Sequence, residues 1–191
     1  EAIRQTASYF IKRKVKKEEV DAIKSKRGMN NDREATYALI DDQKLLFSEV
    51  KDYFQSKYLG KGNTEGLILN EKLLISKVNL LKLKNKYRKL GIATGRPREE
   101  ALFAVRNFNL QTFFPEYYIV ALEDTVKEKP SPDPLLEVKM RMQVKYPVYI
   151  GDTISDVIAA QKAKMPCVYI GEGNLGDFQI KNVNKLMEVI L

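Results

Sequence analysis

The sequence has no histidine and only one cysteine among its 191 residues. The lack of histidine excludes histidine catalysis and histidine metal ligands, so any chemistry depends on carboxylates, lysine and arginine. Cys167 lies in an apolar run and has no partner for an intramolecular disulfide. That pattern favours a reducing, cytoplasmic setting.

Long apolar runs are also missing, since no stretch approaches the ~20 apolar residues that span a bilayer. Glu1 opens an expected helix, and we therefore expect no signal peptide. The length allows one α/β domain with an insertion, or two small domains.

The net charge of +8 raises the question of nucleic-acid binding. The lysines are scattered through amphipathic segments, and no basic run is interleaved with aromatic residues. Examples are Lys12, Lys14, Lys16, Lys17, Lys82, Lys84, Lys86 and Lys89. We expect a solvated lysine surface rather than a nucleic-acid groove, with enough charge to attract small anionic substrates.

The first part of the chain, to about residue 58, reads as wholly helical because its apolar residues recur at helical spacing. Helices are predicted over 1–14, 17–27, a segment that opens with 31–34, and 45–58. Gly28 is the predicted C-cap of the second helix, and residues 31–34 have the form of a capping box. Four short helices with short connections favour a small bundle.

From about Leu74 the pattern changes to helices that alternate with short β-branched strands. Helices are predicted over 77–90, 98–108, 133–142 and after Ser155, and strands over 91–94, 117–120, 148–150 and 167–170. Strands separated by helices of this length predict an α/β fold with a parallel, doubly wound sheet.

Two carboxylates stand where a predicted strand gives way to a helix. Asp152 and Asp156 follow the run 147–150, and Ser155 is a plausible N-cap. Ligands in open α/β sheets bind at the carboxyl ends of strands, and two acids there suit a hard divalent cation. The alternative is that Asp156 only interacts with a helix N-terminus and Asp152 only caps a turn.

Two more loops at predicted strand ends carry polar residues. Thr94, Gly95 and Arg96 precede a helix, where a hydroxyl and backbone N–H groups form an anion seat. Lys129 lies in the loop before the helix at 133–142. Hydroxyl, ammonium and two carboxylates on one rim fit phosphoryl transfer with a metal ion. Taken singly, the first loop could be an ordinary turn and Lys129 a solvated loop lysine.

The order of these residues resembles the haloacid dehalogenase (HAD) superfamily. Thr94, Lys129–Pro130 and Gly151-Asp152 followed by Asp156 look like its motifs II, III and IV. Within the superfamily the chain resembles the phosphoglycolate phosphatase-like branch with a helical cap. Specific motifs support the match over about 74–175, and helical character alone supports it over 11–73.

The resemblance implies a Rossmann-like HAD core with a parallel sheet and a small all-helical cap. The expected division is 1–10 for the start of the core-to-cap helix, 11–73 for the cap and 74–191 for the core.

The implied reaction is Mg²⁺-dependent hydrolysis of a small phosphorylated metabolite through an aspartyl-phosphate. Thr94 and the Gly95 N–H would bind phosphoryl oxygens, and Lys129 would neutralise nucleophile and phosphate. Asp152 would ligate the metal, and Asp156 would ligate it or orient its waters. Arg96 is our candidate for contact with an anionic substrate group.

One motif of the family is missing. A strand that ends in Asp-x-Asp supplies its nucleophile, whereas Asp41-Asp42 here ends a predicted helix. We expect the nucleophile upstream of Glu1, and these 191 residues alone should not turn over a phosphate ester. A phosphomutase or dehalogenase on the same fold, or a non-catalytic binding protein, remain the alternatives.

The absent strand has a predicted place in the fold. In the HAD topology it lies between the strands ending at Thr94 and Gly151, both of which read as buried on two faces. Leaving it out would open a slot between them, so we predict that a strand of about five residues upstream of Glu1, with an Asp-x-Asp turn facing Asp152, or another segment fills it. Direct pairing of the strands at 92–94 and 148–150 would overturn this topology.

A second glycine pattern, Gly171-x-Gly173-x-x-Gly176, follows the last predicted strand. The dinucleotide fingerprint needs a βαβ unit after the glycines, and too few residues remain for one. We interpret this stretch as a loop on the rim of the phosphate site.

Overall fold

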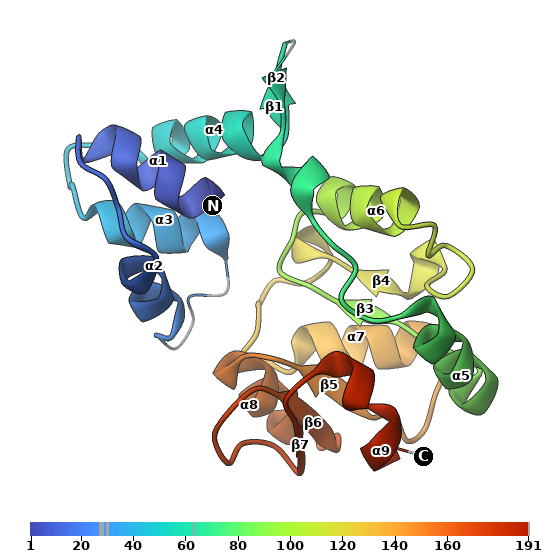
Figure 1. The fold of residues 1–191 in the computed structure, drawn as a ribbon. Coiled ribbons are helices and arrows are strands. Elements are labelled where there is room, and N and C mark those ends of the chain that lie inside the picture. Colours follow the sequence, from blue (N-terminus) through green and yellow to red (C-terminus); the bar gives the residue numbers. More distant parts are fainter. Residues whose placement is uncertain (27–28, 30, 63, 191) are drawn as a thin grey trace. The chain divides into compact units, whose positions relative to one another are not determined.

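The computed structural model describes residues 1–26, 29, 31–62 and 64–190, and these fall into two compact units (Figure 1). The first unit covers Glu1–Lys72 and the second covers Leu73–Leu191. Within the described residues, no helix combines the length and the apolar character needed to cross a membrane.

The first unit is a set of four packed helices. They are α1 (Ala2–Phe10), α2 (Lys17–Lys24), α3 (Asp32–Ile40) and α4 (Phe47–Tyr58). A two-residue hairpin, β1 (Gly60–Lys61) and β2 (Thr64–Glu65), and the 3₁₀ turn η1 (Leu67–Asn70) follow. Helix α1 packs on α3 and α4, and its Ala7 is fully buried with Val15 and Val50.

Helix boundaries in this unit partly match the predicted ones. Asn31 caps α3, and its side chain accepts a hydrogen bond from the Arg33 N–H. Helix α1 ends earlier than predicted, and Lys12 beyond it has a left-handed backbone with φ of 54°. The predicted C-cap at Gly28 lies outside the described residues.

The second unit has α/β architecture. Its helices are α5 (Lys77–Tyr87), α6 (Arg98–Asn107), α7 (Asp133–Met142), α8 (Ile154–Lys162) and α9 (Met187–Ile190). Its strands are β3 (Ile92–Ala93), β4 (Ile119–Val120), β5 (Tyr149–Gly151), β6 (Cys167–Ile170) and β7 (Phe178–Ile180). Short 3₁₀ turns are η2 (Glu116–Tyr118), η3 (Leu122–Asp124) and η4 (Val183–Lys185).

All strand pairs in this unit are parallel, but they form two separate sheets. One sheet has the order β3-β4, and the other has the order β5-β6-β7. Among the described residues, no strand pairs with the second edge of β3 or of β5. The two strands that end at the predicted site therefore do not pair with each other, which agrees with an open slot between them.

The backbone hydrogen bonds show which N–H and C=O groups lie on the unpaired edges of β3 and β5. Thr94 donates to the Val120 carbonyl and Tyr149 donates to the Pro166 carbonyl, so these residues pair toward β4 and β6 respectively. Because successive residues of a strand point their backbone groups to opposite edges, Ala93 and Ile150 present theirs away from β4 and β6.

Candidate active site

Lys129 joins the ends of the two sheets. Its ammonium donates to the Ala93 carbonyl at 3.1 Å and to Asp156 Oδ1 at 2.7 Å. Ala93 ends β3, and Asp156 lies in the first turn of α8, directly after β5. The side chains of Lys129 and Asp156 are only 12% and 5% exposed. Lys129 is therefore part of a buried ion pair rather than a solvated loop lysine.

Asp156 is held by five hydrogen bonds. Its Oδ1 accepts from Lys129 and from the Tyr149 hydroxyl. Its Oδ2 accepts from the N–H groups of Asp152 and Thr153 and from the Thr153 hydroxyl. Burial alone raises the pKa of Asp156, but the Lys129 charge and these hydrogen bonds bring it below its usual value. The carboxylate is thus ionised and committed to organising its loop.

The N-cap of α8 differs from the prediction. Thr153 is the N-cap, and its hydroxyl accepts from the Asp156 N–H at 3.1 Å while Asp156 bonds back to the Thr153 N–H. Ser155 lies inside the helix, so the prediction that it caps α8 was wrong. The reciprocal Thr153–Asp156 bonds form a capping box and satisfy more of the N-terminal donors than Ser155 alone could.

Gly151 makes room for this arrangement. A β-carbon at position 151 would lie 2.6 Å from Cγ of Asp156 and 2.9 Å from its Oδ2. Contacts this short do not occur in proteins, so any side chain at 151 would displace the Asp156 carboxylate. The glycine before Asp152 is therefore explained by packing as well as by the turn.

Asp152 is the exposed carboxylate of the loop. Its N–H is tied to Asp156, and the residue itself is exposed at the strand end. The described residues contain no group of three or more cysteine, aspartate or glutamate side chains placed to hold a metal. Of the two predicted metal ligands, Asp152 presents its carboxylate outward and Asp156 turns its carboxylate inward.

The Thr94 loop lies beside Lys129 through Ala93. The Arg96 N–H donates to the Thr94 hydroxyl at 3.2 Å, and the Arg96 carbonyl accepts from the Leu122 N–H at 2.9 Å. These bonds hold the turn open between β3 and α6. At Gly95 a β-carbon would meet only Glu128 Oε2, at 3.5 Å. The N–H groups of Thr94 and Arg96 already donate within the protein, so this turn can offer the Thr94 hydroxyl and the Gly95 N–H to an anion.

Tyr149 is a site residue that the sequence did not single out. Its hydroxyl lies 3.1 Å from the Lys129 nitrogen and 2.8 Å from Asp156 Oδ1. Burial and the Asp156 charge raise the pKa of Tyr149 well above its usual value, so the phenol stays neutral. The residue lies in the apolar run 147–150, where tyrosine is indistinguishable from an ordinary core residue.

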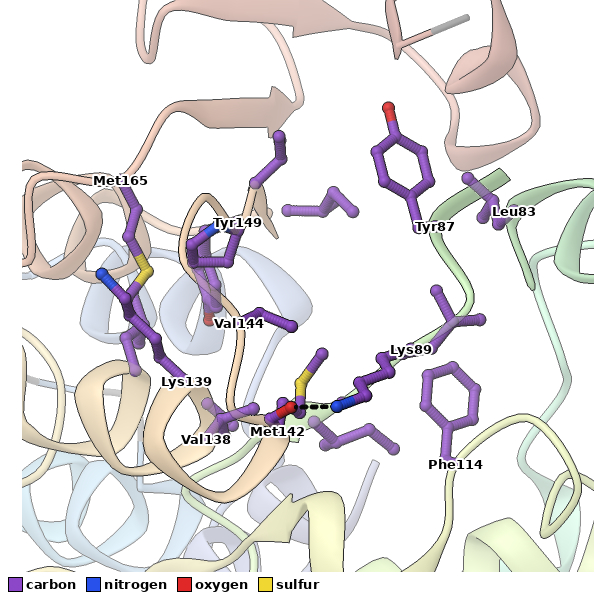
Figure 2. A pocket seen from close by; sticks show the side chains of 18 of the residues that line it. Leu83, Tyr87, Lys89, Phe114, Val138, Lys139, Met142, Val144, Tyr149 and Met165 are labelled. Carbon is purple, nitrogen blue, oxygen red and sulfur yellow. Dashed lines mark hydrogen bonds between the residues drawn. The ribbon is translucent and has the colours of Figure 1, made fainter. Parts of the chain in front are cut away.

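An apolar cavity of about 420 Å³ separates β3 from β5 (Figure 2). Ile92 and Ala93 line it from one strand, and Tyr149 and Ile150 line it from the other. Helices α5 and α7 contribute Leu83, Tyr87, Val138 and Met142. Lys89 crosses one part of the wall and donates to the Met142 carbonyl at 2.7 Å. The cavity has the apolar lining and the two open strand edges that an additional strand requires.

Comparison with known sequences connects this site to a family. The sequence model described as haloacid dehalogenase-like hydrolase matches residues 1–170. The chain belongs to that family. The match confirms the resemblance to the haloacid dehalogenase superfamily that the sequence motifs indicated.

Curated relatives are considerably longer than the matched part. The chain is 33% identical over 172 residues to the imidazoleglycerol-phosphate dehydratase of Phytophthora nicotianae, covering 85% of the chain and 37% of that protein. It is 26% identical over 113 residues to the pyrophosphatase PpaX of Halalkalibacterium halodurans, covering 53% of the chain and 52% of that protein. The chain thus spans about half, or less, of the length of these relatives.

Solved structures share the fold. A Lactobacillus plantarum protein provisionally named a phosphoglycolate phosphatase matches with a TM-score of 0.77 and 16% identity, over 98% of this chain and 88% of that one. CbbY of Rhodobacter sphaeroides, solved with phosphate, matches with a TM-score of 0.73 and 15% identity, over 97% and 88%. At these identities the likeness establishes the HAD fold.

Proposed function

We propose that this chain is the core and cap of a Mg²⁺-dependent phosphatase for small phosphate monoesters. The observation that carries the proposal is the Lys129 ammonium, which lies between the end of β3 and Asp156 at the edge shared by the Thr94 and Asp152 loops. Phosphoryl transfer needs cationic and donor groups around the moving phosphoryl group, and this edge supplies them.

The metal would be held by Asp152. Mg²⁺ is commonly bound by one or two carboxylates, substrate phosphate oxygens and waters, so a single outward carboxylate suits it. The bound ion would neutralise charge on the phosphoryl oxygens. Asp156 fits a supporting part, since its oxygens already accept five hydrogen bonds and hold the Asp152 backbone.

The nucleophile would be an aspartate on a strand that occupies the cavity between β3 and β5. A strand parallel to both neighbours would end at the same edge as they do, beside Lys129 and Asp152. Its carboxylate oxygen would attack phosphorus and break the bond to the ester oxygen, and the second aspartate of Asp-x-Asp would protonate the departing alcohol. Water would then attack phosphorus of the aspartyl-phosphate, releasing inorganic phosphate and the free carboxylate. Thr94 and the Gly95 N–H would bind phosphoryl oxygens, and Arg96 would meet a second anionic group of the substrate.

The first unit would act as a helical cap that excludes water from the reaction. We propose a cytoplasmic enzyme whose partner is a small phosphorylated metabolite, with neither nucleic acid nor membrane involved. The net charge of +8 would favour the approach of such an anion. A dehalogenase is the weaker candidate because it has little use for Asp152 as a metal ligand.

The test is a panel of phosphate monoesters with Mg²⁺, on a chain that carries an Asp-x-Asp strand ahead of residue 1. We expect phosphate release that stops on chelation of the metal. Lys129→Met should abolish turnover, whereas Lys127→Met, an exposed lysine in the same loop, should leave it unchanged. Halide release, phosphoryl transfer between sugars, or an active Lys129→Met variant would each overturn the proposal.

A further inference from the structure

Tyr149, Lys129 and Asp156 form a closed triangle of hydrogen bonds at the end of β5. The Lys129 nitrogen lies 2.7 Å from Asp156 Oδ1 and 3.1 Å from the Tyr149 hydroxyl, which lies 2.8 Å from the same carboxylate oxygen. We propose that Tyr149 is a positioning residue that sets the direction of the Lys129 ammonium; its part in catalysis rests on the proposed function.

Only one assignment of hydrogen-bond donors and acceptors is possible in the triangle. An ammonium only donates and an ionised carboxylate only accepts, so the tyrosine hydroxyl must accept from Lys129 and donate to Asp156. No other uncharged side chain of this reach and rigidity supplies both functions on one atom. The third N–H of Lys129 points to the Ala93 carbonyl at 3.1 Å. These three acceptors constrain the direction of the ammonium.

Packing around the ring of Tyr149 holds its hydroxyl in one position. The ring packs against a buried cluster that includes Leu135, Val157 and Cys167. A tyrosine held in this way has few rotamers left, so its hydroxyl cannot follow Lys129 if the lysine moves. Without that acceptor the ammonium loses one of the contacts that fix its direction, and the flexible four-carbon stem has more freedom to turn.

The substitution Tyr149→Phe removes the hydroxyl and keeps the ring. The first measurement is the rate at which an amine-reactive reagent labels Lys129, followed by mass spectrometry on the 191-residue chain. We expect several-fold faster labelling in the variant. Tyr169→Phe, on the neighbouring strand β6 and partly buried against the same cluster, should leave the rate unchanged.

The second measurement is steady-state kinetics on a catalytically complete chain. Tyr149→Phe should lower kcat by about 10- to 100-fold with little change in KM, because a misplacement of ~1 Å costs up to about 10²-fold. Unchanged Lys129 labelling overturns the inference whether or not the protein is a phosphatase. If the parent enzyme is active and the variant labels faster with unchanged kcat, Tyr149 positions Lys129 but has no part in catalysis.

If the parent enzyme is inactive, only the proposed phosphatase function is contradicted. The labelling rate then decides by itself whether Tyr149 positions Lys129.

Discussion

Gly151 is the residue on which the packing of the site depends most sharply. Its missing β-carbon leaves the space that the Asp156 carboxylate fills, and the carboxylate accepts its five hydrogen bonds from that position. The contrast with Gly95 is informative, because there a β-carbon would make only an ordinary contact with Glu128.

Gly151→Ala should therefore lower the free energy of unfolding by about 1–3 kcal/mol, the usual cost of overpacking a rigid site. Gly95→Ala is the matched control and should change it by less than about 1 kcal/mol. Urea titration of both variants measures the difference. Equal stability of the two variants would show that Asp156 can move without cost.

Replacing each loop aspartate by asparagine should have a different effect for Asp152 than for Asp156. Asp152→Asn should weaken Mg²⁺ binding, since a charged ligand oxygen becomes neutral. Asp156→Asn should affect Mg²⁺ less but destabilise the fold by about 1–3 kcal/mol, because an amide N–H₂ group then faces donors. Calorimetric Mg²⁺ titration and thermal unfolding of each variant distinguish the roles. A larger loss of affinity for Asp156→Asn would reverse our assignment.

At the residue scale, the sequence predicted what depends on chemical type and spacing. Lys129 and Asp156 were predicted at one edge, and the structure joins them directly. Tyr149 was missed because a tyrosine in an apolar strand looks like a core residue until the atoms near its hydroxyl are known. Thr153 and Ser155 both have cap chemistry, and the acid three residues after Thr153 completes a capping box that identifies Thr153 as the cap.

At the scale of elements, an ionic cluster fixes the loop after β4. Asp124 pairs with Arg98 at the start of α6 and with Arg141 of α7, and it accepts from the Ala121 N–H. Burial raises the pKa of Asp124, but the two arginines and the backbone donor outweigh it and bring the value to about 2. Three elements thus depend on one ionised carboxylate.

This pKa predicts a pH dependence of stability. A carboxylate whose folded pKa lies below its unfolded value of ~3.9 stabilises the fold above that value, and the contribution fades as pH falls toward the folded pKa. Asp124→Asn should therefore be less stable than the parent at pH 7, with the gap closing between about pH 4 and about pH 2. Unfolding curves across that range measure it. A gap that persists at pH 2 would assign the effect to packing.

The elements differ in how well the sequence predicted them. Helices α6 and α7 were predicted within a residue, because Pro97 precedes the start of α6 and Pro134 lies in the first turn of α7. Helix α5 ends early at Arg88, where φ is 61°, and a non-glycine residue in that conformation gives no sequence signal. Strand β7 was missed because its three residues follow a glycine-rich loop and are too short to show alternation.

At the scale of the molecule, the described residues of the second unit form two parallel sheets, whereas the sequence predicted a single parallel sheet. The cavity of about 420 Å³ lies between the edges of β3 and β5 that no described strand pairs with, and it has the lining that an inserted strand would need. Each unpaired buried backbone group costs about 1–3 kcal/mol, so a strand of about five residues in this place would contribute a large share of a domain's stability.

The 191-residue chain should therefore bind the apolar dye ANS in this cavity. An N-terminal extension with an apolar five-residue strand should remove the dye and raise the melting temperature. An extension of equal length in which serine replaces the apolar residues is the control. Equal dye binding by both extensions would show that the space between β3 and β5 is not a strand site.

The five hydrogen bonds to Asp156 have a consequence for ligand binding. The backbone and side chains around 152–156 lose their conformational entropy when the protein folds, before any ion or phosphate arrives. Association then immobilises little that was mobile, and the main entropic cost is the loss of the ligand's own translation and rotation. If the loop binds a metal or phosphate as proposed, it would do so with a shape whose ordering was completed during folding.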